Sequence, residues 1–206
     1  MDELDHQLIA RLRSNARSSV AALAKQLQVA RGTIQNRIAK LEREGASFAN
    51  IADIGTGTGL LAFAALKLWP DAKCMATDID PTAIDVARDN AAINGVPLGM
   101  QAGELVLAVA EGMDSALLTA RARFDLIIAN ILAGPLIELA PDFAKVLAPG
   151  GMIILAGLLD TQADAVAAAY KKLGLTLSDR GSGEWPVLVA VRAAKPPPRL
   201  SPIPLR

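Results

Sequence analysis

The sequence predicts an α/β protein with a mostly parallel sheet, preceded by a small unit of three helices. From residue 50 onward, short apolar segments alternate with longer segments of helical spacing, a pattern typical of a parallel sheet covered by helices on both faces. The first apolar segment runs into the glycine-rich stretch NIADIGTGTGLL at residues 50–61. Ligands of such sheets bind outside the carboxyl ends of the strands, so we expect a binding site at that edge.

The chain is expected to divide into three parts. Residues 1–45 form the three-helix unit, residues 46–194 the α/β domain, and residues 195–206, with five prolines, a disordered tail. Apolar residues stripe each of the first three helices at helical spacing, and Gly45 ends the third. The exposed face of that third helix carries side-chain types that contact phosphates and base edges, namely Arg31, Thr33, Gln35, Asn36, Arg37 and Lys40.

Within the α/β domain, hydrophobic periodicity and turn residues predict the order of the elements. The segments 175–179 and 185–192 are separated by a turn-forming stretch and are expected to close the sheet as an antiparallel pair, which gives seven strands. The other strands are predicted at 50–54, 73–77, 104–110, 124–129 and 151–156, and the helices at 58–69, 81–94, 114–122, 134–147 and 161–173.

The spacing of the glycines discriminates between ligand classes. A dinucleotide-binding fingerprint needs glycine at its first, third and sixth positions, but the sixth position counted from Gly55 is Leu60. No Gly-Lys-Ser/Thr follows the turn, which excludes a P-loop. An acid two positions before alternate glycines instead resembles motif I of Rossmann-like S-adenosylmethionine methyltransferases. The resemblance implies that the cofactor binds at Asp53, Gly55, Thr56, Gly57 and Gly59.

An acid at the end of the second strand fits the same site. Asp78 closes the segment 73–77 and follows Gly55 by 23 residues, near the spacing of about 20 between a glycine turn and an acid that binds the ribose hydroxyls. A role as a helix N-cap is the alternative for Asp78. Asp80 fills that role better, because Pro81 follows it as the first helical residue. We therefore expect Asp78 to bind the ribose.

The fourth strand delivers Asn130 to the carboxyl edge, beside the glycine turn. An amide side chain there can accept hydrogen bonds from an attacking amine and aim its lone pair at a methyl carbon. Asn130 could instead cap the helix that begins near Pro135. Glu111 and Asp114, after the third strand, lie where such folds approach the adenine, and solvated loop acids are an equally good interpretation of these two residues.

Four long blocks of sequence carry a more specific resemblance. They are ADIGTGTGLLAFAALKLWP, ATDIDPTAIDVARDNAAINGV, FDLIIANILAGPLIELAPDFAKVLAPGG and LAGLLDTQADAVAAAYKKLGL. Together they resemble the PrmA family, which trimethylates amino groups of large-subunit ribosomal protein eleven. The similarity covers residues 50–192, and NILAGPL separates it from amide methyltransferases, which carry Asn-Pro-Pro-Tyr. It implies S-adenosylmethionine as the cofactor, contacts to the cofactor from Gly55 and Asp78, and a place for Asn130 between the cofactor and the target amine.

A second resemblance covers residues 1–45. LDHQLIARLRSNAR and VAALAKQLQVARGTIQNRIAKLEREG resemble the N-terminal helix-turn-helix of the Lrp/AsnC family of bacterial transcription regulators. This implies DNA binding through the third helix, and a packing or interaction module is the alternative. We expect the docking domain of PrmA, and the glycine- and threonine-rich segment that closes over its cofactor, to be absent. Cofactor binding with weak activity on the ribosomal protein is therefore expected.

Composition excludes several classes of protein. No apolar run reaches the ~18 residues that a membrane span requires, and the acidic, polar start MDELDHQ is not typical of a signal peptide. One histidine, His6, and one cysteine, Cys74, leave no metal-ligand cluster and no Ser-His-Asp arrangement. We expect a cytoplasmic protein without a metal. Residues 1–45 carry eight Lys/Arg against five Asp/Glu, which permits contact with nucleic acid.

Two functions from different classes follow from these observations. The first is an S-adenosylmethionine-dependent amine N-methyltransferase of proteins, with large-subunit ribosomal protein eleven as its partner. The alternative is a DNA-binding transcriptional regulator of the Lrp/AsnC type, in which the Rossmann-like domain senses a ligand or only supports the fold. Turnover, and not affinity for the cofactor, would separate the two.

Overall fold

The computed structural model describes residues 45–180 and 185–194. Two sets of predictions lie outside the described residues: the tail at 195–206, and the helix-turn-helix with the six residues expected on its exposed face, Arg31, Thr33, Gln35, Asn36, Arg37 and Lys40. The strands are β1 (Asn50–Ile54), β2 (Lys73–Asp78), β3 (Leu105–Val109), β4 (Phe124–Asn130), β5 (Leu147–Ala156), β6 (Leu175–Arg180) and β7 (Leu188–Arg192). The helices are α4 (Leu60–Leu68), α5 (Pro81–Ile93), α6 (Ala116–Arg121), α7 (Ala133–Glu138), α8 (Ala140–Val146) and α9 (Asp160–Lys172).

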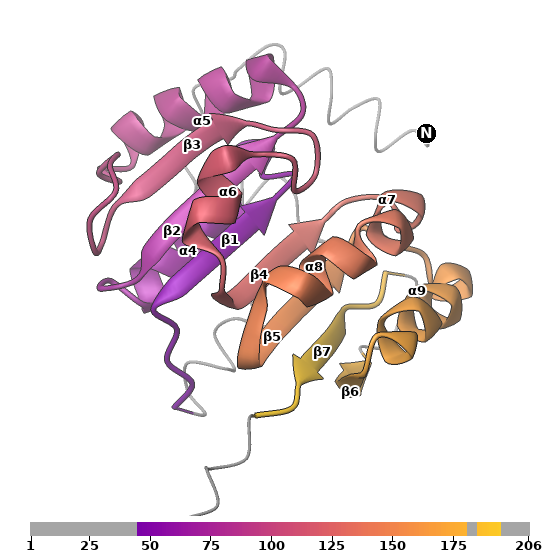
Figure 1. Ribbon diagram of the computed structural model, residues 1–206. Coiled ribbons are helices and arrows are strands. Elements are labelled where there is room, and N and C mark those ends of the chain that lie inside the picture. Colours follow the sequence, from indigo (N-terminus) through magenta and orange to yellow (C-terminus); the bar gives the residue numbers. More distant parts are fainter. Residues whose placement is uncertain (1–44, 181–184, 195–206) are drawn as a thin grey trace, which may run out of the picture.

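The strands form one seven-stranded sheet in the order β3-β2-β1-β4-β5-β7-β6 (Figure 1). Strands β1 to β5 run parallel to their neighbours among themselves, and β7 is antiparallel to both β5 and β6. The α/β architecture and the predicted antiparallel closing pair are therefore confirmed. Because β1 to β5 point the same way, their last residues share one edge of the sheet, which we call the carboxyl edge.

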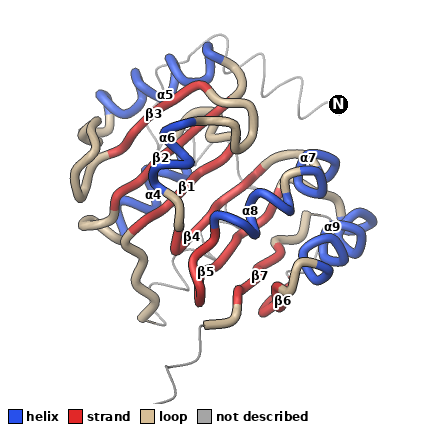
Figure 2. The backbone as a smooth tube through the Cα atoms, in the orientation of Figure 1, coloured by secondary structure: helices blue, strands red, loops and turns tan. Residues whose placement is uncertain are grey.

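Helices cover both faces of the sheet, so its central strands are apolar on both sides. On one face, side chains of α6, α7, α8 and α9 pack against the sheet, with Phe143 and Tyr170 fully buried. Figures 1 and 2 show α6 and α8 in front of the sheet, with α7 and α9 beside each other. On the other face, α4 and α5 pack against the sheet through residues such as Ala62 and Ala91. None of the described helices is long and apolar enough to cross a membrane.

The helix predicted at 134–147 is two helices, α7 and α8, joined at Leu139. Pro141 is the physical reason, because it has no N–H to donate to the carbonyl four residues earlier and so interrupts the helical hydrogen bonds. The strand that follows also begins earlier than the predicted residue 151. Leu147 pairs with Phe124 of β4, which extends β5 toward α8.

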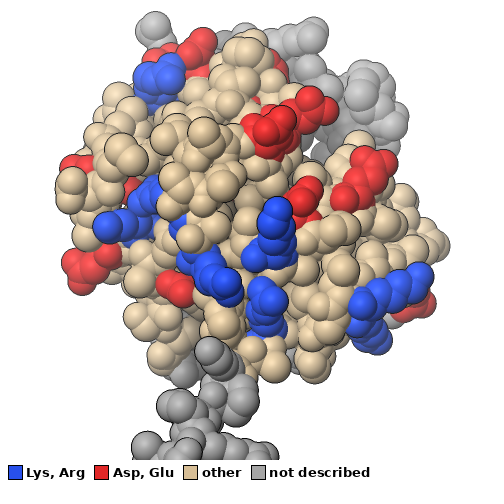
Figure 3. Space-filling model, in the orientation of Figure 1, with Lys and Arg blue, Asp and Glu red and all other residues tan. Residues whose placement is uncertain are grey.

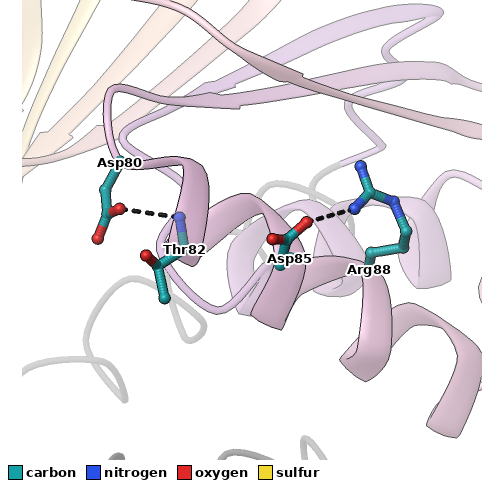
Figure 4. A network of polar contacts seen from close by, with 4 residues as sticks. All are labelled: Asp80, Thr82, Asp85 and Arg88. Carbon is teal, nitrogen blue, oxygen red and sulfur yellow. Dashed lines mark hydrogen bonds and ion pairs between the residues drawn. The ribbon is translucent and has the colours of Figure 1, made fainter.

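Helix α5 begins as the sequence predicts. Asp80 is its N-cap and accepts the N–H of Thr82 at Oδ1 over 2.8 Å, and Pro81 is its first residue (Figure 4). One turn later, Arg88 forms an exposed ion pair with Asp85, which contributes little to stability because solvent screens it. Since Asp80 caps the helix, Asp78 is left for other contacts.

Candidate functional site

The glycine turn lies between β1 and α4 at the carboxyl edge. Gly55, Gly57 and Gly59 all have positive φ angles, of 72°, 56° and 84°, which residues other than glycine rarely adopt. The N–H groups of Gly55 and Thr56 both donate to the carbonyl of Thr77 at 2.9 Å, so the turn is tied to β2. The N–H of Gly59 donates to Thr56. The amides of Gly55, Thr56 and Gly59 thus donate their hydrogen bonds inside the fold.

The three glycines differ in what lies beside them. A Cβ added at Gly55 would collide with Cγ2 of Ile131, and one added at Gly59 would collide with the ring of Phe63. At Gly57, no atom lies within 4 Å of that position. A ligand therefore has room to approach the backbone at Gly57, while the other two glycines allow close packing within the protein.

Asp53 lies beneath the turn and is fully buried. Its Oδ2 accepts the hydroxyl of Thr56 at 2.7 Å and the N–H of Ala62 at 3.1 Å, so Asp53 braces both the turn and the start of α4. Burial raises the pKa of Asp53 from 3.8 to about 6, the two hydrogen bonds oppose this rise, and the charge of Asp78 adds to it. Asp53 and Thr56, both predicted to bind the cofactor, thus face each other rather than the surface.

Asp78 is the last residue of β2 and is partly exposed. Its Oδ2 accepts the N–H of Gly57 at 2.8 Å, and its Oδ1 accepts the N–H of Asp80 at 3.1 Å. The structure therefore brings Asp78 directly to the glycine turn, as the spacing in the sequence predicts. A carboxylate offers about four lone-pair sites, so two remain to accept hydrogen bonds from the hydroxyls of a ligand.

Asn130 is the last residue of β4 and pairs with Ala156 of β5. It does not cap a helix, because the N-cap of α7 is Leu132 and no side chain caps that helix. Among the residues that the structure describes, none forms a hydrogen bond with the Asn130 side chain. The capping alternative is therefore wrong, and the partly exposed amide of Asn130 is available to a ligand.

Sequence reasoning missed Asn90, which supports the turn from α5. This side chain is 1% exposed and donates from Nδ2 to the carbonyl of Thr58 at 3.0 Å. The sequence contains a signal for this role. Asn90 lies on the apolar stripe of α5 with Ile84, Ala87 and Ala91, and a polar residue on a buried stripe indicates a specific hydrogen bond. Sequence reasoning also missed the packing of Ile131 on the turn, which depends on the order of the strands.

Exposed apolar side chains line the same edge. Ile79 follows β2 and is 64% exposed, Val109 ends β3 and is 52% exposed, and Leu132, just beyond β4, is 73% exposed. Large apolar side chains that gather at a surface beside a few polar groups are typical of a ligand site. Glu111 and Asp114 lie after β3 in a turn closed by the N–H of Asp114 to the carbonyl of Glu111, and both are exposed.

Charge is distributed unevenly between the two edges of the sheet. Lysine and arginine lie at the amino ends of strands: Lys73 begins β2, Arg123 precedes β4 and Lys145 precedes β5. Figure 3 shows several Asp and Glu side chains in the upper part of the view and most Lys and Arg side chains below them. Acids such as Asp71 and Glu104 also precede strands at the amino edge, but the segments that join β1 to β5 to the helices after them contain no Lys or Arg. These acids end or follow strands at the carboxyl edge: Asp78, Asp80, Glu111, Asp114 and Asp160.

Two family models match the chain. The model described as ribosomal protein L11 methyltransferase (PrmA) matches residues 31–193. The model described as the AsnC-type helix-turn-helix domain matches residues 1–42, so residues 31–42 fall within both matches. The chain is also 54% identical over 127 residues to the ribosomal protein L11 methyltransferase of Brucella suis, and 50% identical over 121 residues to that of Rhizobium meliloti. These matches cover 62% and 59% of this chain but only 42% and 40% of the relatives.

Solved structures agree with these matches. A ribosomal protein L11 methylase from Lactobacillus delbrueckii superposes with a TM-score of 0.64 and 30% identity, over 77% of this chain and 78% of that one. The N-methyltransferase NodS from Bradyrhizobium japonicum, in complex with S-adenosyl-L-homocysteine, gives a TM-score of 0.59 over 78% of this chain and 86% of that one. At 16% identity, the second likeness shows the shared fold only.

Proposed function

The chain belongs to the ribosomal protein L11 methyltransferase family, and from this we propose that it is an S-adenosylmethionine-dependent methyltransferase that acts on amino groups of a protein. The observation that best supports the proposal is the meeting of three strand ends at one edge. The glycine turn follows β1, Asp78 ends β2 and Asn130 ends β4, and Asp78 accepts the Gly57 N–H over 2.8 Å. The family match favours this function over that of a regulator without turnover.

The residues at this edge fit the cofactor. Gly57 leaves open space at its backbone, and Asp78 keeps lone pairs for two ribose hydroxyls. Ile79 and Val109 offer exposed apolar surface at this edge, which would suit an adenine ring. When bound, S-adenosylmethionine supplies a methyl group on a positively charged sulfur. The acids of the carboxyl edge favour such a cation and the approach of a basic acceptor protein.

The role of Asn130 is to hold and orient the acceptor. Its Oδ1 would accept an N–H of the neutral amine, which would leave the lone pair of the nitrogen free to take up the methyl group. Asn130 takes up no proton, because an amide is not basic at neutral pH, so the proton of the product leaves to solvent. Positioning and exclusion of water therefore carry most of the catalysis.

We assign ribosomal protein L11 as the acceptor and the cytoplasm as the compartment. The named activity of the Brucella and Rhizobium relatives supports this acceptor. The experiment is incubation of the full chain with purified ribosomal protein L11 and methyl-labelled S-adenosylmethionine. Transfer of label by the wild-type chain, and its loss by roughly 100-fold in Asn130→Ala, is the expected result. Gln101→Ala, an exposed amide in the loop before β3, is the control and should keep the wild-type rate.

Absence of label in the wild-type reaction would contradict the proposed acceptor. Repeating the reaction with a cell extract then separates a wrong acceptor from a wrong function. Labelling of any extract protein would show that the chain is a methyltransferase with a different acceptor. If Asn130→Ala and Gln101→Ala transfer label equally well, the role given to Asn130 is wrong. Both variants are first compared with wild type by circular dichroism, so that a loss of fold is not mistaken for a loss of activity.

A second property is supported by the AsnC-type match to residues 1–42. We propose that this segment binds DNA through Arg31, Thr33, Gln35, Asn36 and Arg37. Binding of the full chain to duplex DNA should weaken as salt rises, because phosphate contacts release counterions, and Arg37→Ala should weaken it further. Binding that is insensitive to salt, or no binding at low salt, would favour a packing or interaction module instead.

A further inference from the structure

Three neighbouring strands end side by side at the carboxyl edge, and the residues just beyond their last pairs are in contact. Strand β4 lies between β1 and β5, and its final pairs are Ala129 with Ile54 and Asn130 with Ala156. The next residues are Gly55 after β1, Ile131 after β4 and Gly157 after β5. An isoleucine thus lies between two glycines, directly after Asn130.

The first glycine accommodates the Ile131 side chain. Gly55 has a φ of +72°, and a Cβ added there would collide with Cγ2 of Ile131. Cγ2 of Ile131 therefore occupies the space that any other residue at position 55 would fill with its own side chain. Ile131 is also packed against the larger of the two apolar clusters, which fixes it on the side facing the core.

The second glycine accommodates the Ile131 backbone. Gly157 has a φ of +82°, and a Cβ added there would lie 2.5 Å from the carbonyl oxygen of Ile131 and 3.0 Å from its backbone nitrogen. That nitrogen is bonded to the carbonyl carbon of Asn130. A side chain at position 157 would therefore push on the peptide that carries Asn130.

Asn130 needs such support because its side chain has no hydrogen-bond partner among the described residues. Its direction is then set by its backbone, and the backbone is set by its neighbours. We propose that Ile131 and Gly157 are positioning residues for methyl transfer: Ile131 is held between Gly55 and Gly157, and this holds Asn130 where the acceptor amine binds. The inference rests on the proposed function, since Asn130 matters only if an amine is methylated there.

Gly157→Ala and Gly174→Ala form a matched pair of variants. Gly174 has nearly the same φ, +81°, but no atom lies within 4 Å of an added Cβ there, so its variant carries the backbone strain without the collision. The measurements are the single-turnover rate of methyl transfer to ribosomal protein L11 at saturating cofactor, and the affinity for S-adenosylhomocysteine. We expect Gly157→Ala to lose roughly 100-fold in rate, as displacement by about 1 Å can cause, and to keep most of its affinity. Gly174→Ala should match wild type in both.

Ile131→Val and Ile131→Ala give a second test that does not depend on the stability of a glycine variant. Valine keeps the methyl group over Gly55, whereas alanine removes it. The side-chain amide signals of Asn130 in a nitrogen–proton NMR spectrum, assigned by their loss in Asn130→Asp, should shift in Ile131→Ala and in Gly157→Ala. They should stay near their wild-type positions in Ile131→Val and Gly174→Ala.

The proposal is overturned if the Asn130 signals move no further in Ile131→Ala and Gly157→Ala than in the two controls. Provided that the wild-type chain methylates the ribosomal protein, it is also overturned if the rate in Gly157→Ala equals that in Gly174→Ala. The NMR readout needs no turnover, so it decides the positioning even if wild type methylates nothing. A wild-type chain without turnover would contradict the proposed function alone, and the NMR spectra would still test the positioning of Asn130. The failure of one proposal can thus be told apart from the failure of the other.

Discussion

Replacing the buried carboxylate of Asp53 by an amide should change how the stability of the protein depends on pH. In Asp53→Asn, the remaining oxygen can still accept the Thr56 hydroxyl and the Ala62 N–H. The other carboxylate oxygen, Oδ1, is buried and has no hydrogen-bond partner among the described residues, so the new amide group replaces an unsatisfied atom. The substitution therefore removes a titrating group with little change of shape.

The size and sign of the effect follow from the pKa of Asp53. Folding raises it from 3.8 to about 6, a difference that corresponds to about 3 kcal/mol. Between these values the folded protein keeps the proton and the unfolded chain has lost it, so the folded state binds more protons. The stabilisation due to Asp53 is fully present below pH 3.8 and is lost as the pH rises through about 6.

The assay is urea unfolding of wild type and Asp53→Asn at several pH values across this window, followed by circular dichroism. The free energy of unfolding of wild type minus that of the variant should fall by up to about 3 kcal/mol as the pH rises. Asp71→Asn, at an exposed site between α4 and β2, is the matched control. A difference between wild type and Asp53→Asn that stays constant, or grows with pH, would refute the conclusion that burial beneath the turn raises the pKa of Asp53.

Three further substitutions test the contacts around the site. Asp78→Ala should weaken binding of S-adenosylhomocysteine by roughly 10- to 150-fold in calorimetry, because it removes a charged hydrogen-bond acceptor; equal affinity would count against the ribose assignment. Asn90→Ala should lower the free energy of unfolding by about 1–3 kcal/mol, because it leaves the Thr58 carbonyl without its donor, and unchanged stability in urea would contradict this. Tyr170→Phe should cost a similar amount, because the buried hydroxyl donates to the Leu136 carbonyl at 2.9 Å, and a variant as stable as wild type would contradict this.

Local patterns in the sequence predict much of this fold. Apolar runs and helical spacing establish the order of strands and helices, and parallel pairing then brings the strand ends to one edge. This is why the residue spacing alone predicts that Asp78 meets the glycine turn. The hydrogen bond from the Gly57 N–H to the Asp78 carboxylate is that contact. Asp80 and Pro81 likewise predict the start of α5 from local chemistry.

The rest depended on contacts between distant residues. The motif suggests a ligand contact for Asp53, but its burial beneath the turn follows from how α4 packs on β1. The contact of Ile131 with Gly55 and Gly157 requires β4 to lie between β1 and β5, a sheet order that no local pattern specifies. The break at Leu139 had a visible cause in Pro141, but the apolar spacing continues through it and indicates one helix.

A crystal structure of the full chain with S-adenosylhomocysteine tests the central claim most directly. It should show the ribose hydroxyls hydrogen-bonded to the Asp78 carboxylate, the ligand in contact with the backbone of Gly57, and the sulfur directed toward Asn130. A ligand bound elsewhere on the chain, or bound at this edge with its sulfur turned away from Asn130, would contradict the account.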